Sequence, residues 1–217
     1  MRRTISVPLY VGAFLMSLAI FIVGIYIGST MDSSHLASIS EDVSSVSDRV
    51  ASVQLLILME GNSSAFCPAY SSELDAIDRE VERMGYMLSY LENEKGVYDN
   101  ELKKKYFVLE AESYLLSRKV GSLCGGGSVL LINFYSNKRC DNCKAQGTEV
   151  LKARDELAAD GIDVKLFSFD GDLNSSVADA LAAQYSIDSY PSVVIDGKTY
   201  AGYRSSDELT ALIKGQT

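Results

Sequence analysis

The sequence predicts a chain in three parts: one membrane-crossing helix, a region of amphipathic helices, and a C-terminal α/β domain with the element order βαβαββα. Three observations lead to this prediction. Residues 7–28 carry no charged side chain. Apolar residues then recur at steps of three and four between residues 36 and 123, as they do along helix seams. After residue 128, short apolar runs alternate with helical patterns, as in α/β domains.

The first element is the apolar segment 7–28. As a helix it is roughly 33 Å long at ~1.5 Å per residue, which is enough to cross the hydrocarbon core of a bilayer. A cleavable signal peptide is the alternative reading, because Arg2 and Arg3 precede the segment. The segment is longer than the usual signal core and residues 28–30 make a poor cleavage site, so we expect a retained anchor.

Positive charge predicts the orientation of this anchor. Arg2 and Arg3 precede it, whereas residues 29–48 contain no Lys or Arg. We therefore expect residues 1–6 to form a cytoplasmic tail and everything after residue 28 to lie outside the cytoplasm. Disulfides persist in such a compartment.

Three amphipathic helices are expected next. The first is a heptad helix over residues 32–60, and the other two form an antiparallel hairpin over 67–124 that turns near Lys95 and Gly96. The predicted seam of the first helix consists of Leu36, Ile39, Val43, Val46, Val50, Val53 and Ile57. This helix either packs onto the hairpin or pairs with a second copy of the chain, as a homodimer stalk through residues 36–57.

Cys67 and Cys124 lie at equal distances from the predicted turn of the hairpin, so folding the hairpin brings them to the same end. We predict a structural disulfide between them. Two alternatives remain open at this stage. The pair is a second redox couple that reaches Cys140 across a glycine hinge at residues 125–127, or the four cysteines bind zinc together.

The C-terminal domain is predicted from residue 128 to residue 217. Its expected elements are strands at 129–135, 163–169, 192–195 and 198–202, and helices at 145–159, 175–185 and 206–213. Between the first strand and the first helix lies the sequence Cys140-Asp141-Asn142-Cys143.

This CxxC motif carries the clearest chemical signal in the chain. The start of a helix stabilises a thiolate, and Lys138 and Arg139 add positive charge beside Cys140. Cys140 is therefore the expected nucleophile, and Cys143, one turn into the same helix, is expected to resolve a mixed disulfide. Asp141 acts in the opposite direction, because its negative charge raises the thiol pKa.

With the CxxC motif, the element order and Tyr190-Pro191 before a strand, residues 128–217 resemble the thioredoxin-like superfamily in its minimal form. The resemblance implies a protein-disulfide oxidoreductase without a dissociable cofactor or metal. It further implies that Pro191 is a cis-proline and that Tyr190 and Pro191 face the substrate. The implied partners are extracytoplasmic cysteine-containing proteins and an unidentified redox partner.

Two departures from the family pattern affect the predicted function. Asn133 stands where many thioredoxins carry a buried acid, and the dipeptide between the cysteines is Asp141-Asn142. The direction of exchange is therefore not predicted. A tethered protein-interaction module with an idle CxxC pair is the alternative function. The net charge of -9 argues against nucleic-acid binding.

Overall fold

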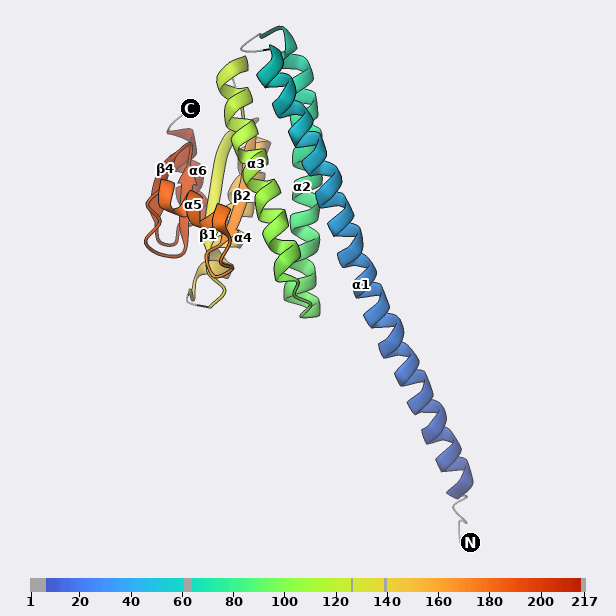
Figure 1. The fold of residues 1–217 in the computed structure, drawn as a ribbon. Coiled ribbons are helices and arrows are strands. Elements are labelled where there is room, and N and C mark those ends of the chain that lie inside the picture. Colours follow the sequence, from blue (N-terminus) through green and yellow to red (C-terminus); the bar gives the residue numbers. More distant parts are fainter. Residues whose placement is uncertain (1–6, 61–63, 126, 139, 216–217) are drawn as a thin grey trace.

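The computed structural model describes residues 7–60, 64–125, 127–138 and 140–215 (Figure 1). The predicted tail at 1–6, residues 61–63 after the predicted heptad helix, Gly126, Arg139 and residues 216–217 lie outside these ranges. The elements follow in the order α1 (Val7–Glu60), η1 (Ser64–Phe66), α2 (Cys67–Lys95), α3 (Asn100–Cys124), β1 (Val129–Tyr135), α4 (Cys143–Ala159), β2 (Val164–Asp170), α5 (Ser176–Gln184), β3 (Ser192–Ile195), β4 (Lys198–Ala201) and α6 (Ser206–Lys214).

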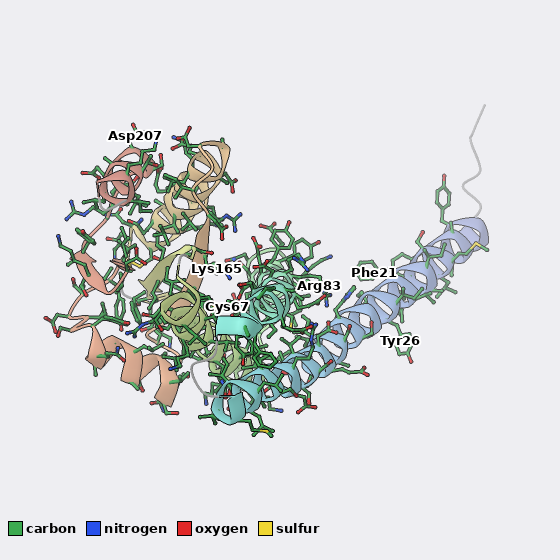
Figure 2. All side chains as sticks on the ribbon, turned by 90° about the horizontal axis from the view of Figure 1, so that it is seen from above. Phe21, Tyr26, Cys67, Arg83, Lys165 and Asp207 are labelled. Carbon is green, nitrogen blue, oxygen red and sulfur yellow. A yellow bond between two sulfur atoms is a disulfide. The ribbon has the colours of Figure 1, made fainter. Side chains whose placement is uncertain are left out.

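Helix α1 joins two segments that were predicted as separate elements, the apolar segment 7–28 and the heptad helix 32–60. It is one continuous helix of 54 residues. Its first half projects from the rest of the molecule, and Figure 2 shows Phe21 and Tyr26 on this projecting part. The stretch Tyr10–Gly28 is long and apolar enough to cross a membrane, and a signal sequence would fit the same description.

The second half of α1 packs on α2 and α3 to form a three-helix bundle (Figure 1). Its seam residues from Ile39 to Ile57 are buried in the core of this bundle. On the outside, Asp42 pairs with Arg83 at 2.9 Å and Arg49 pairs with Glu73 at 2.7 Å. The seam is thus filled within one chain, which is the first of the two predicted arrangements, and the homodimer stalk through residues 36–57 stays a prediction.

The turn between α2 and α3 is defined by two caps. Gly96 ends α2 with a φ of 64°, a left-handed conformation that glycine adopts without strain. Asp99 then begins α3, because its side chain accepts a hydrogen bond from the Leu102 N–H at 2.9 Å. The hairpin therefore turns where Lys95 and Gly96 predicted.

The α/β domain contains a four-stranded sheet in the order β2-β1-β3-β4. Strands β1 and β2 are parallel, whereas β3 runs antiparallel to both β1 and β4. A core beside α4 and α6 includes Val129 and Leu131, and a second core beside α3 and α5 includes Ile132 and Phe134. The element order is the predicted βαβαββα, with a mixed sheet between helices.

Helix α3 has a second buried side, which the apolar spacing did not predict. Besides the seam that faces α1 and α2, it buries Lys103, Phe107, Glu110, Ala111, Tyr114 and Ser117. Phe107 meets Phe169 of β2 edge-on with 5.4 Å between the ring centroids, and Tyr114 meets Phe167 in the same way at 5.3 Å. The helical hairpin thus covers one face of the sheet.

Buried polar contacts fix the bundle to the sheet. The Glu110 carboxyl group accepts a hydrogen bond from the Ser168 N–H of β2 at 2.6 Å. Asp78 of α2 forms an ion pair with Lys165 of β2 and accepts a 2.6 Å hydrogen bond from Ser113. Burial raises the pKa of Asp78, and Lys165 and Ser113 oppose that rise. These directional contacts set one orientation of the bundle on the sheet.

Candidate functional site

Cys140 and Cys143 form a disulfide with 5.5 Å between their Cα atoms. The sequence predicted that Cys140 opens the helix, with Cys143 one turn inside it. In the structure α4 begins at Cys143, and Cys140 precedes a turn made by Asp141 and Asn142. Asp and Asn favour turns over helix interiors, which accounts for Cys140 lying outside the helix, although the helix begins two residues before the predicted range of 145–159. Cys140 therefore lies just beyond the free amide groups at the start of α4.

The two sulfur-bearing residues differ in access. Cys143 is 6% exposed, whereas Cys140 is half-buried. The Ser136 N–H points to Sγ of Cys143 at 3.4 Å. An incoming thiol or disulfide therefore reaches Cys140 first, and the inner sulfur is held near a backbone donor that stabilises negative charge.

Two carboxylates hold the loop between β1 and Cys140. Asp172 accepts a 2.6 Å hydrogen bond from the Ser136 hydroxyl and one of 2.9 Å from the Lys138 N–H. Asp170, at the end of β2, accepts a 2.7 Å hydrogen bond from the side-chain amide of Asn137. Neither carboxylate was predicted from the sequence. Their position at the end of a buried strand and two residues beyond it was the available signal.

Lys103 links this loop to the helical hairpin. It is buried on α3, and its Nζ lies 2.8 Å from Glu92 of α2 and 3.4 Å from Asp170. Desolvation lowers the pKa of Lys103, but Tyr135, Glu92 and Asp170 outweigh this effect and raise it overall. Lys103 therefore stays charged and neutralises the carboxylates behind the CxxC loop.

Asn133 is buried in the middle of the sheet. Side chains alternate along a strand, so Asn133 shares the sheet face of Val129 and Leu131, on which α4 packs. Within the described part of the chain, its Oδ1 atom has no hydrogen-bond partner. Asparagine provides no proton acceptor of the carboxylate kind beneath the CxxC motif.

The Tyr190–Pro191 peptide bond is cis. Phe134 of β1 pairs with Ser192 of β3, so Pro191 lies opposite Tyr135, where the loop to Cys140 begins. The Tyr190 side chain packs against the core on the α3 side, and its hydroxyl occupies the space that a Cβ on Gly171 would need. Pro191 thus borders the CxxC loop, whereas much of Tyr190 is taken up by internal packing.

Among the described residues, no hydrogen bond or ion pair joins Sγ of Cys140 to the charged residues that were expected to change the pKa of its thiol. The side chains of Lys138 and Asp141 are exposed beside Cys140. Arg139 lies outside the described residues. Direct support for the loop comes instead from Asp170 and Asp172, and Lys103 pairs with Asp170.

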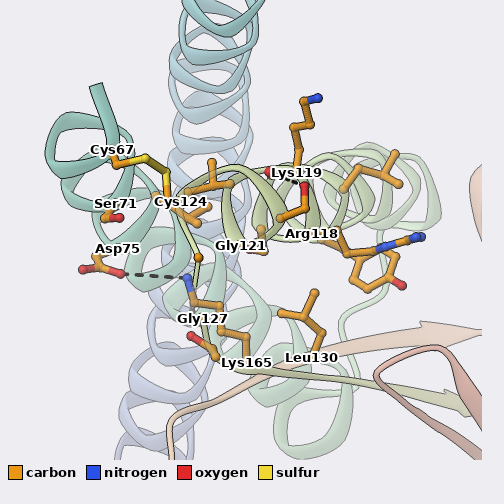
Figure 3. A pocket seen from close by; sticks show the side chains of 18 of the residues that line it. Cys67, Ser71, Asp75, Arg118, Lys119, Gly121, Cys124, Gly127, Leu130 and Lys165 are labelled. Atoms are coloured by element: carbon orange, nitrogen blue, oxygen red, sulfur yellow. Dashed lines mark hydrogen bonds and ion pairs between the residues drawn. A yellow bond between two sulfur atoms is a disulfide. The ribbon is translucent and has the colours of Figure 1, made fainter. Parts of the chain in front are cut away.

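Cys67 and Cys124 form the other disulfide, also with a Cα separation of 5.5 Å. Figure 3 shows this bond beside a groove of about 1120 Å³, whose lining also includes Asp75, Lys119 and Lys165. Cys124 lies near the start of β1 and Cys140 follows its end, so the strand of roughly 20 Å separates the two pairs. This placement does not bring Cys67 and Cys124 to Cys140, as a relay or a four-thiolate zinc site would require.

The chain is similar to several known proteins, including one curated relative and two solved structures. The chain is 32% identical over 95 residues to protein disulfide-isomerase of Oryctolagus cuniculus, a match that covers 41% of this chain and 18% of that protein. No family model matches. Among solved structures, it is similar to thioredoxin-2, a component of the malaria parasite protein secretion machinery, with 28% identity and a TM-score of 0.33. That match covers 42% of this chain and 90% of the other.

A second solved structure, the first thioredoxin domain of mouse protein disulfide-isomerase A4, gives 21% identity and a TM-score of 0.33. It covers 44% of this chain and 67% of that one. The chain spans less than a fifth of the curated relative. The sequence similarity to protein disulfide-isomerase, together with the Cys140–Cys143 disulfide, supports a thiol-disulfide oxidoreductase.

Proposed function

We propose that the chain is a membrane-anchored thiol-disulfide oxidoreductase that acts outside the cytoplasm on disulfides of other proteins. One observation carries this proposal: a disulfide between half-buried Cys140 and buried Cys143, placed at the start of α4 and bordered by Pro191. The similarity to protein disulfide-isomerase agrees with it. The proposed anchor is the predicted segment 7–28, and the stretch Tyr10–Gly28, which is long and apolar enough to cross a membrane, supports it.

In the proposed reaction, Cys140 is the sulfur that exchanges with the partner. A reduced Cys140 thiolate attacks a partner disulfide, breaks its S–S bond and forms a mixed disulfide, and one partner sulfur leaves as a thiolate. Cys143 then attacks Sγ of Cys140 and releases the second partner sulfur. The partner gains two electrons and, after protonation, two thiols, while the CxxC pair becomes a disulfide. The reverse sequence oxidises a partner dithiol.

The deciding experiment is the reduction potential of the Cys140/Cys143 pair. The full chain would be equilibrated in glutathione buffers, alkylated, and mapped by peptide so that Cys67 and Cys124 are followed separately. A potential near about -120 to -180 mV indicates a disulfide donor or isomerase, and one near about -270 mV indicates a reductase. If the pair shows no reversible transition, the proposal is wrong and a tethered interaction module takes its place.

A further inference from the structure

The ion pairs of the bundle show how far the CxxC site lies from the proposed anchor along the axis of α1. Helices α1 and α2 are antiparallel, because Asp42 pairs with Arg83 and the later Arg49 pairs with the earlier Glu73. At ~1.5 Å per residue, Asp42 lies about 21 Å along α1 from Gly28, the end of the apolar stretch. Glu92 lies about 13 Å closer to the anchor than Arg83. Glu92 is therefore within roughly 10 Å of the level of Gly28.

The loop that carries Cys140 lies at the same level as Glu92. Glu92 pairs with Lys103, Lys103 pairs with Asp170, and Asp170 accepts a hydrogen bond from Asn137 in that loop. Figure 1 shows the α2–α3 turn and the loop after β1 at the end of the domain nearest the projecting part of α1. The buried contacts between α3 and the sheet hold this orientation.

Exposed tyrosines gather at this same end. Tyr98 in the α2–α3 turn is 69% exposed, and Tyr86 and Tyr90 on the last turns of α2 are 75% and 46% exposed. Tyrosine is enriched where proteins meet the headgroup region of a membrane, because its ring is apolar and its hydroxyl is polar. The exposed tyrosines are a second observation, independent of the helix geometry, and they too indicate that this end of the molecule faces lipid.

We propose that the CxxC site faces the bilayer, so that its exchange partner is a cysteine pair in the lipid-proximal part of an integral membrane protein. This inference rests on the anchor and on the exchange function proposed above. A partner thiolate attacks Sγ of Cys140 and Cys143 leaves as a thiolate. The partner's second thiolate then attacks the partner sulfur that is bonded to Cys140, forms the partner's disulfide and releases Cys140 as a thiolate. Two electrons and two protons pass from the partner dithiol to the CxxC pair.

The orientation is tested first, without any redox step. The chain contains no tryptophan, so a single substitution creates a unique reporter. Tyr98→Trp and Leu58→Trp are placed in the full chain and reconstituted in phosphatidylcholine vesicles that contain headgroup nitroxide lipids. Leu58 is 80% exposed and lies about 45 Å along α1 from Gly28. We expect the Tyr98→Trp emission to fall at least twofold relative to Leu58→Trp. Equal quenching of the two reporters, or none, overturns the orientation.

The partner class is tested with a defined probe, a short Cys-x-x-Cys dithiol peptide attached to phosphatidylethanolamine in the same vesicles. Five helical turns, inserted between Thr30 and Met31, lift the site by about 27 Å without rotating it. We expect this variant to oxidise the lipid-linked peptide at least tenfold more slowly than the parent chain, with an unchanged rate toward the same peptide free in solution. The matched control carries the same insertion between Thr4 and Ile5.

The outcomes separate the two proposals. If the parent chain neither oxidises the dithiol form of the free peptide nor reduces its disulfide form, the exchange function itself fails. If it oxidises the free peptide but the insertion between Thr30 and Met31 leaves the lipid-linked rate unchanged, exchange stands and the membrane-facing partner is wrong. Circular dichroism and an intact Cys67–Cys124 bond show that the inserted variant has kept its bundle.

Discussion

The two disulfides have the same Cα separation but different surroundings. Cys67–Cys124 spans 57 residues and connects the ends of two packed helices, whereas Cys140–Cys143 spans three residues beside a loop held by carboxylates. A bond across a long loop constrains the unfolded chain strongly, and a bond across three residues constrains it little. The surroundings therefore favour a structural role for the first bond and a chemical role for the second.

The largest expected effect comes from removing the outer sulfur of the CxxC pair. Cys140→Ala should lower the rate of exchange with a peptide disulfide at least about 1000-fold, because the attacking thiolate is lost. Cys143→Ala should instead accumulate a mixed disulfide through Cys140, which non-reducing gels would detect. If Cys140→Ala retains activity and Cys143→Ala loses it, the assignment of the two sulfurs is reversed.

The opposite result is expected at the other bond. Replacing both Cys67 and Cys124 by alanine should lower the free energy of unfolding by about 3–4 kcal/mol, because the long loop is no longer closed in the unfolded chain. Denaturation of the full chain in detergent measures this. The rate of exchange at Cys140 should stay within about twofold of the parent, since β1 separates the two sites. A large loss of exchange in the double variant would show that the two bonds are coupled.

The seam of the bundle could be predicted because its signal is local. Ile39, Val50 and Ile57 repeat at helical spacing, and the structure buries them as that spacing indicated. The second side of α3 could not be predicted in this way, because Lys103 and Glu110 interrupt its apolar pattern. Their burial depends on Asp170 and Ser168, which are distant in sequence and become partners only when the hairpin lies on the sheet.

The site shows the same division between local and distant signals. The CxxC spacing and Tyr190-Pro191 could be recognised from the sequence. The expected place of Cys140 at the start of the helix was wrong, because the turn residues Asp141 and Asn142 keep it outside α4. Asp172 supports the loop from another strand end, and only tertiary structure brings it to Ser136.

A substitution at Asn133 should affect the Cys140–Cys143 site and leave the Cys67–Cys124 bond unchanged, because Asn133 lies beneath α4 and far from Cys67. Asn133→Asp places a carboxylate in a buried site, which raises its pKa above that of the unfolded chain. The stability that this proton contributes is present below about pH 4 and is lost as the pH rises. We expect the free energy of unfolding at pH 8 to fall by about 1–3 kcal/mol relative to the parent.

The matched control for this substitution is Asn142→Asp, at an exposed position, which should change stability by less than about 0.5 kcal/mol. The new carboxylate should also accelerate resolution of the mixed disulfide, because it can accept the Cys143 proton. Stopped-flow alkylation of the trapped intermediate measures that rate. An unchanged rate would mean that Asn133 is not close enough to Cys143 to act on it.

Glu110 joins α3 to β2 between the levels of the two disulfides. Burial raises the pKa of Glu110 to about 8, and the Ser168 N–H, Lys103 and Tyr106 oppose that rise. Because this value lies above that of the unfolded chain, the stabilising contribution is fully present below about pH 4.5 and is lost as the pH rises toward 8.

Glu110→Gln keeps an acceptor for the Ser168 N–H but cannot titrate. The parent chain should lose stability with a slope of about 1 kcal/mol per pH unit between pH 5 and 8, and the variant should lack that part of the slope. Glu101→Gln is the control, because the Glu101 side chain is 80% exposed. Parallel pH profiles for the parent and Glu110→Gln would mean that Glu110 is already ionised on the sheet, with Lys103 as its counter-charge. Charge pairing between Glu110 and Lys103 would then help to hold the bundle on the CxxC domain, and protonation of Glu110 would not contribute to stability.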